Sequence, residues 1–277
     1  MRSPPGPPVS HGPKIVAYSN WSRVLAAAHM LKRLLKSLIG AVLTAVLAAS
    51  PIATARAQDV TGIANADVRA GYRALSLRFG YLTPDDGRPP ILAGQFNYQH
   101  NFSETFGVQG AALFTRIDDA RIEFRGFQTQ MQWQFAENET AGLDGSLSLI
   151  SRIPDGDDGP GRVALVAAGK WTREDWELRA MLALPVEFGE RARAGVGLVV
   201  RGEVTRRIGA VGRFGAQFSD NFNTTAHFGA FREQNHQLGP VFKKPVGRHL
   251  MVTAVALIGL SGAAPDVETK LFLTFEF

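Results

Sequence analysis

Residues 266–277 alternate between apolar and polar side chains up to the last residue, which is an aromatic. Successive side chains of a β-strand point to opposite faces, so a two-residue period predicts a strand with one apolar and one polar face. A strand that ends the chain on an aromatic residue is typical of an outer-membrane β-barrel. The apolar face holds Val267, Thr269, Leu271, Leu273, Phe275 and Phe277, the polar face holds Glu268, Lys270, Thr274 and Glu276, and Phe272 breaks the pattern.

The same alternation recurs between Gly-, Pro- and Asp-rich turns through the whole chain after Gln58. No sustained apolar stripe with the 3.6-residue period of a helix accompanies it, so we predict an all-β fold. Many of the segments are longer than the five or six residues usual in soluble sandwiches, and they suit the tilted crossing of about 9–11 residues in a membrane barrel. The predicted strands are 68–81, 91–101, 106–117, 120–136, 143–153, 161–171, 175–188, 192–206, 209–219, 236–244, 248–260 and 266–277.

The polar faces of these strands favour a transmembrane barrel over a periplasmic β-sandwich. One strand carries Gln128, Gln130, Gln132 and Gln134 on a single face, and others carry charged residues at alternate positions. A polar interior with an apolar exterior is the inverse of a soluble core. Aromatic residues near the predicted strand ends fit the two interfacial girdles of a membrane barrel; they are Tyr81, Trp133, Phe135, Trp171, Trp176, Phe275 and Phe277.

Parity sets the number of strands. Both ends of a bacterial barrel normally face the periplasm, which requires an even number. Residues 224–232 also alternate, but a strand there would give thirteen, so we place 220–235 in a long outer loop. We therefore expect a transmembrane antiparallel up-and-down β-barrel of twelve strands, although ten or fourteen would also satisfy parity.

The N-terminal part of the chain differs in charge from the rest. Residues 1–57 hold 7 of the 30 Lys and Arg residues and no acid, which leaves 58–277 with a net charge of −2. Residues 30–57 combine a basic start, a short apolar run and an Ala-x-Ala site ending at Ala57, the pattern of a cleavable signal peptide. We interpret 1–29 as a mis-assigned extension and 58–277 as the barrel domain. Without the basic leader, nothing favours nucleic-acid binding.

The sequence offers little for catalysis. It has no Cys, which excludes thiol chemistry and Cys-ligated metals. His100 and Ser103 form the nearest local pair for an outer-membrane hydrolase, but strand side chains three apart point to opposite faces. The acidic pairs 85–86, 118–119 and 157–158 lie in predicted outer loops, where solvated loop tips are the simpler interpretation. We expect no enzymatic activity, no metal site and no cofactor.

The inward side chains leave two functions open. A mixed set of charges can line a narrow polar pore, or it can pair into a lattice that closes the bore of a structural or adhesion barrel. Twelve strands enclose less space than a general porin does, so a wide pore is excluded. The pore-lining candidates are Arg78, Gln130, Lys170, Glu177, Arg179, Arg201, Glu203 and Arg213.

The last forty or so residues resemble a known family. Residues 237–241 read Gln-Leu-Gly-Pro-Val, and 260–266 read Leu-Ser-Gly-Ala-Ala-Pro-Asp before the terminal strand. Both are similar to segments of the outer-membrane transporter barrels associated with phenol meta-pathway degradation. The resemblance implies a twelve-stranded barrel for hydrophobic or aromatic small molecules and carries no catalytic residues. A purely apolar cargo does not fit a lumen with charged side chains at Glu177, Arg179, Arg201 and Glu203.

These observations together predict a porin-like protein of the Gram-negative outer membrane, exported through a signal peptide cleaved after Ala57. We expect a narrow channel or passive transporter for small molecules, with a closed barrel or a hydrolase as alternatives. The expected partners are outer-membrane lipid and lipopolysaccharide, the barrel assembly machinery and a small-molecule cargo. Leu271, Leu273, Phe275 and Phe277 are the predicted C-terminal signal for membrane insertion.

Overall fold

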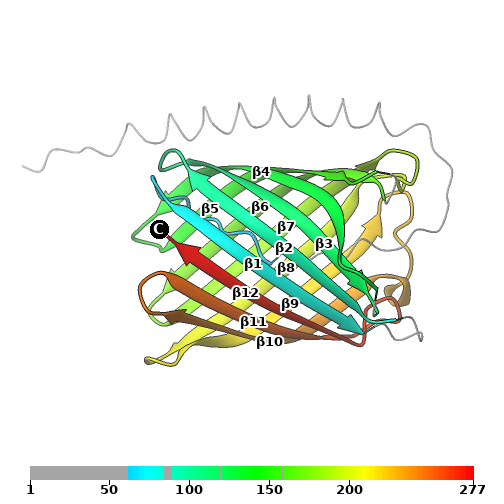
Figure 1. The fold of residues 1–277 in the computed structure, drawn as a ribbon. Helices are drawn as coiled ribbons and strands as arrows, with labels where there is room; N and C mark the ends of the chain where they lie inside the picture. Colours follow the sequence, from blue (N-terminus) through cyan, green and yellow to red (C-terminus); the bar gives the residue numbers. More distant parts are fainter. Residues whose placement is uncertain (1–61, 84–88, 119, 157–158) are drawn as a thin grey trace, which may run out of the picture. The chain divides into compact units, whose positions relative to one another are not determined.

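The computed structural model describes residues 62–277 except 84–88, 119 and 157–158. The predicted extension 1–29, the signal peptide 30–57 and its cleavage site lie outside the described residues. The described chain forms twelve strands in one closed antiparallel barrel, as predicted (Figure 1). The strands are β1 (Arg73–Thr83), β2 (Ile91–Asn101), β3 (Phe106–Ile117), β4 (Glu123–Asn138), β5 (Leu143–Pro154), β6 (Gly161–Arg173), β7 (Trp176–Phe188), β8 (Gly197–Ile208), β9 (Gly212–Thr224), β10 (Asn235–Val246), β11 (Leu250–Gly259) and β12 (Val267–Glu276).

Each strand pairs with its neighbours along the chain, and β1 pairs with β12 to close the barrel. The closing register runs from Ala74 opposite Glu276 to Thr83 opposite Val267. Closure gives the edge backbone groups of both strands partners, which an open sheet could not provide in lipid. Turns of two to four residues join strands at one end, here called the short-turn end, and connections of five to ten residues join them at the long-loop end.

Three predicted boundaries differ from the structure by five residues, and the others differ by at most three. The strand predicted from 68 begins at Arg73, because residues 62–72 make their hydrogen bonds inside the barrel and at its rim. The strand predicted from 192 begins at Gly197, because Gly195 has φ 88°, a left-handed conformation that interrupts an extended strand. The strand predicted to end at 219 continues to Thr224, so the first part of the predicted outer loop 220–235 is strand.

The rest of that outer loop agrees with the parity argument. Residues 225–234 contain only a 3-10 turn, η1 (Phe231–Glu233), instead of a thirteenth strand. Asn223, near the end of β9, has φ 65°, and its side chain donates to the carbonyl of Glu233 at 2.9 Å. The loop is therefore folded back on the end of β9.

Large apolar side chains cover the outside of the barrel. Within the described part of the chain, no helix is long and apolar enough to span a membrane. The outward faces of the strands instead form an apolar belt of the kind that contacts lipid. Of the aromatics predicted near strand ends, Tyr81 lies toward the long-loop end, and the others lie toward the short-turn end. Exposed members of the belt include Leu75, Leu77, Phe79, Phe96, Met131, Trp133, Phe135, Leu149, Trp176, Leu178, Leu182, Val204, Phe218, Leu271 and Phe275.

Phe272, which broke the alternation of the last strand, points to the inside. It shares the inner face of β12 with the buried Glu268 and Lys270, and the guanidinium carbon of Arg78 lies 5.4 Å from its ring centroid. A Cβ placed on Gly62 would lie 2.9 Å from the same ring. Phe272 thus gives an apolar contact to the chain around Gly62, which lies in the bore.

Candidate functional site

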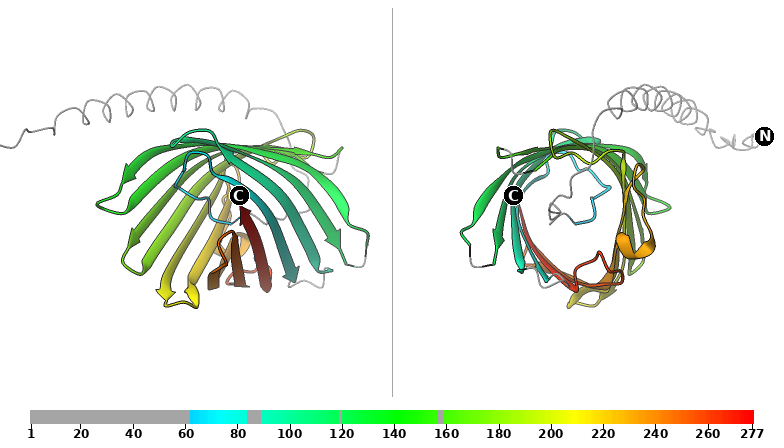
Figure 2. Two further views of the ribbon diagram at one scale, coloured as in Figure 1. Left: turned by 60° about the vertical axis from the view of Figure 1, so that its left-hand side comes forward. Right: turned by 90° about the vertical axis from the view of Figure 1, so that its right-hand side faces the viewer.

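Residues 62–72, here called the luminal segment, lie inside the barrel. Figure 2 shows the cyan start of the described chain within the ring of strands. At the short-turn end, the Gly71 amide donates to the Asn101 carbonyl at 3.1 Å, and the Asn101 amide donates to Tyr72 at 2.9 Å. At the other end of the segment, Arg201 donates to the Gly62 carbonyl at 3.3 Å.

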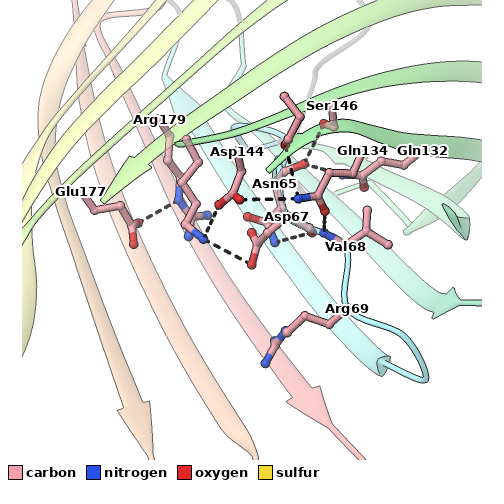
Figure 3. A network of polar contacts seen from close by, with 12 residues as sticks. Asn65, Asp67, Val68, Arg69, Gln132, Gln134, Asp144, Ser146, Glu177 and Arg179 are labelled. Carbon is pink, nitrogen blue, oxygen red and sulfur yellow. Dashed lines mark hydrogen bonds and ion pairs between the residues drawn. The ribbon is translucent and has the colours of Figure 1, made fainter. Parts of the chain in front are cut away.

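Side chains of β4 and β5 hold the backbone of the luminal segment (Figure 3). The Val68 amide donates to Oε1 of Gln134 at 2.5 Å. The Asn65 carbonyl accepts from Nε2 of Gln132 at 2.7 Å and from Oγ of Ser146 at 3.4 Å. Two of the four predicted inward glutamines, Gln132 and Gln134, therefore give backbone groups of the segment the hydrogen-bond partners that a neighbouring strand would supply.

An ion pair fixes the middle of the segment. Nζ of Lys170 lies 3.3 Å from a carboxylate oxygen of Asp67 and 3.3 Å from one of Asp144 on β5. The Lys170 side chain is 17% exposed, so water screens these pairs less than it would on a surface. One lysine thus joins the luminal segment to two strands of the wall.

Apolar packing adds to these polar contacts. Ala66 is completely buried against a patch of the wall on β6, β7 and β8 that includes Val166, Met181 and Val199. The Ala64 amide points at Sδ of Met181, 3.4 Å away. A small side chain at Ala66 lets the segment lie close to the wall.

At the rim of the short-turn end, Tyr72 anchors the end of the segment to β12. Its hydroxyl donates to Oε1 of Glu276 at 3.3 Å, and the guanidinium of Arg69 lies 4.9 Å from its ring centroid. Burial, supported by the nearby Glu276 charge, raises the pKa of Tyr72 to about 12. The phenol therefore keeps its proton to a higher pH than an ordinary tyrosine does.

A second polar group, here called the ionic cluster, consists of Glu177, Arg179, Glu203, Arg213 and Lys243 on the inner face of β7 to β10. Nε of Arg179 lies 2.8 Å from Glu177, and Nζ of Lys243 pairs with Glu203 and lies 3.6 Å from Glu177. Nε of Arg213 lies 3.9 Å from Glu177. Both signs meet here, so this part of the wall is largely neutralised.

The pore-lining candidates thus fall into three sets, all on inner faces. Lys170 and Arg201 hold the luminal segment, and four candidates belong to the ionic cluster. Gln130 donates to Ser148 at 3.3 Å, and Arg78 contacts Phe272. Sequence reasoning missed Lys243, although its place in the alternation of β10 was a usable signal. It also missed Asn65 and Asp67, because no periodic pattern marks the segment before β1.

His100 and Ser103, the local pair considered for a hydrolase, are engaged separately. The His100 ring packs edge-on against Phe102, with centroids 4.4 Å apart. Oγ of Ser103 instead accepts from the amides of Thr105 and Phe106, which caps the turn between β2 and β3. The acidic pairs lie wholly or partly outside the described residues, and the residues that are described contain no group of three or more metal-ligating side chains.

One histidine does meet a carboxylate, at the long-loop end. Nδ1 of His236 lies 2.9 Å from Asp220, and Nε2 lies 2.9 Å from Oε1 of Gln234. The ring also stacks on Phe231 at 4.3 Å. One ring nitrogen is thus engaged with β9 and the other with the 225–234 loop, and Ser261 bonds to the His236 backbone amide rather than to its ring.

Comparisons with known proteins give a fold but no family. Neither a scan against protein-family models nor a search of curated proteins finds a match. The structure resembles the COG4313 outer membrane channel from Pseudomonas putida F1, with a TM-score of 0.64 and 10% identity over 78% of this chain and 100% of that chain. It also resembles the KdgM porin, with a TM-score of 0.53 and 9% identity over 74% and 99%. At such identities the similarity establishes an outer-membrane barrel fold.

Proposed function

We propose that this protein is a narrow channel for small molecules in the outer membrane of a Gram-negative bacterium, and that the luminal segment controls its opening. The apolar belt faces lipid, and the bore is lined by glutamines, serines and charged residues. By the usual orientation of such barrels, the short-turn end faces the periplasm, so the luminal segment enters from that side.

The proposal rests on what fills the bore. In the closed alternative, paired side chains of the wall would fill the bore. Here the described bore holds a separate stretch of chain, attached by side-chain hydrogen bonds and by the Asp67–Lys170 ion pair. Each neutral hydrogen bond contributes about 1 kcal/mol net, so such an attachment is reversible. Displacing the segment would leave a polar passage.

The resemblance of residues 237–277 to the phenol meta-pathway barrels supports a small, partly hydrophobic cargo. The separate engagement of His100 and Ser103 supports a protein without hydrolase activity. The exposed Leu271, Phe275 and Phe277 support the C-terminal insertion signal, with the barrel assembly machinery as the partner. Outer-membrane lipid and lipopolysaccharide would contact the apolar belt and the long loops.

Single-channel recording in planar bilayers tests the proposal. The Gln132→Ala/Gln134→Ala variant removes two hydrogen bonds from the segment, about 2 kcal/mol together, which should raise the population of the open state roughly thirtyfold. Gln130→Ala is the matched control, because Gln130 lies on the same strand and face but bonds to Ser148.

We expect brief, discrete openings in the native protein, longer or more frequent openings in the double variant, and native behaviour in the control. Heat-modifiable migration in gels confirms that each variant is folded. Silent bilayers from all three folded proteins would overturn the channel proposal in favour of a closed barrel. Equal conductance in all three would show an open pore that the luminal segment does not control.

A further inference from the structure

His236 on β10 joins the wall of the barrel to the loop that follows β9, and only 8% of its side chain is exposed. Its Nδ1 lies 2.9 Å from a carboxylate oxygen of Asp220 on β9. Its Nε2 lies 2.9 Å from Oε1 of Gln234, the last residue of the 225–234 loop. We call the side chains of Asp220, Gln234 and His236 the histidine latch.

Two backbone contacts fix the orientation of the Gln234 amide. Its Nε2 donates to the carbonyl of Phe228 at 3.2 Å and to the carbonyl of Gly229 at 3.3 Å. Exchanging the amide nitrogen and oxygen would place an acceptor against these two acceptors. The oxygen of Gln234 is therefore directed at His236, and Nε2 of the ring must donate to it.

The carboxylate of Asp220 sets the role of the other ring nitrogen. An ionised carboxylate only accepts hydrogen bonds, so Nδ1 must donate as well, and both nitrogens of a histidine carry a proton only in the imidazolium form. Phe231 stacks on the ring with centroids 4.3 Å apart, and the face of an aromatic ring attracts a cation. The latch is thus complete with a charged ring, whereas a neutral ring can make only one of the two bonds.

The elements around His236 differ in the charges that they bring. The charged contact from β9 is Asp220, and the connection after β11 contributes Ser261, which does not titrate in this range. The 225–234 loop also carries His227, Arg232 and Glu233, all of them exposed. The carboxylate of Glu233 accepts from a backbone amide within the loop at 2.9 Å. The direct ionic contact of the ring is therefore the one with Asp220.

We propose that the histidine latch is a pH-sensitive switch, which holds the 225–234 loop against β9 and β10 when the ring is protonated and loosens it when the ring is neutral. Histidine is the side chain that ordinarily changes its charge between about pH 5 and pH 8. The bonds from Asn223 to the carbonyls of Phe228 and Glu233 do not titrate, so the loop loosens without detaching. The switch does not depend on the proposed channel function.

Hydrogen–deuterium exchange of the folded protein in lipid vesicles tests the switch, with mass spectrometry of peptides that cover the 225–234 loop. Protection is compared at about pH 5 and about pH 8, after correction for the intrinsic effect of pH on exchange. We expect the protection of the native loop to fall about tenfold or more at the higher pH, because one hydrogen bond to a charged group is lost. His236→Gln cannot form an imidazolium, so its loop should be equally protected at both pH values.

Asp220→Asn is a second variant, which keeps the test decisive if His236→Gln does not fold. The amide of an asparagine can donate to a neutral ring nitrogen or accept from a protonated one, so this variant should also lose the pH dependence. The control is His227→Gln, which replaces an exposed histidine of the same loop and should behave as the native protein does. Equal protection of the native loop at both pH values, an unchanged pH dependence in either latch variant, or its loss in the control would overturn the proposal.

Discussion

The ionic cluster gives a sharp prediction about stability, because its charges are poorly accessible to water. The side chains of Lys243 and Glu203 are 11% and 4% exposed and pair directly. Glu177 has two other cations, Arg179 and Arg213, whereas Glu203 depends on Lys243. Replacing Lys243 with Met keeps the length of the side chain and leaves the carboxylate of Glu203 buried without its partner.

Breaking a buried ion pair from one side costs about 3–5 kcal/mol. We expect the lower value for Lys243→Met, about 3 kcal/mol, because Glu203 can regain some hydration from the lumen. Adding Glu203→Gln removes the unpaired charge, so the double variant should lose only about 1 kcal/mol. Adding Glu203→Gln to Lys243→Met should therefore recover about 2 kcal/mol.

Reversible urea unfolding in lipid vesicles, followed by tryptophan fluorescence, measures these free energies. Lys244→Met is the control, since Lys244 is the exposed neighbour on the other face of β10 and its loss should change stability by no more than about 0.5 kcal/mol. The reasoning is refuted if Lys243→Met unfolds at the native urea concentration. It is equally refuted if Glu203→Gln fails to restore stability, because the cost would then lie in packing.

Three further predictions concern the wall and the short-turn end of the barrel. A Cβ on Gly239 would overlap the backbone of β11, so Gly239→Ala should cost about 1–3 kcal/mol in the same unfolding assay, whereas Gly110→Ala, with open space around it, should cost less than about 0.5 kcal/mol. Because the pKa of Tyr72 is raised to about 12, the folded protein retains a proton that the unfolded chain loses near pH 10; stability present below pH 10 should fall as the pH rises toward 12, and Tyr72→Phe should reduce that slope. Phe277→Ala should lower the amount of barrel assembled in cells and leave refolding in detergent unchanged; impaired refolding would instead indicate a structural role.

The sequence predicted the wall of the barrel well, because a strand's two faces are a local property. The alternation at Leu271, Leu273 and Phe275 needs only a strand with a two-residue period and apolar surroundings on one face. The count of twelve followed from parity, which correctly excluded a strand at 224–232. The boundaries were less accurate, since Gly195 ends a ladder through its own backbone conformation.

The sequence could not predict what occupies the bore. Asn65 and Asp67 belong to a segment without periodicity, and their partners Gln132, Ser146 and Lys170 are 67 to about a hundred residues away along the chain. The alternation on β4 predicted that its glutamines face the interior, but only the structure shows that Gln132 and Gln134 hold the luminal segment. The same holds for His236 and Asp220, which the β9–β10 register brings together.

The sequence by itself thus determined that the chain forms an all-β barrel with an apolar exterior, because alternation is written residue by residue. The tertiary structure alone decided which inward side chains meet. Barrel closure arranges strands that are far apart in the sequence around one lumen. There Lys170 pairs with Asp67 and Asp144, and Lys243 pairs with Glu203. Such pairings depend on strand register and on distances across the bore, neither of which a two-residue period encodes.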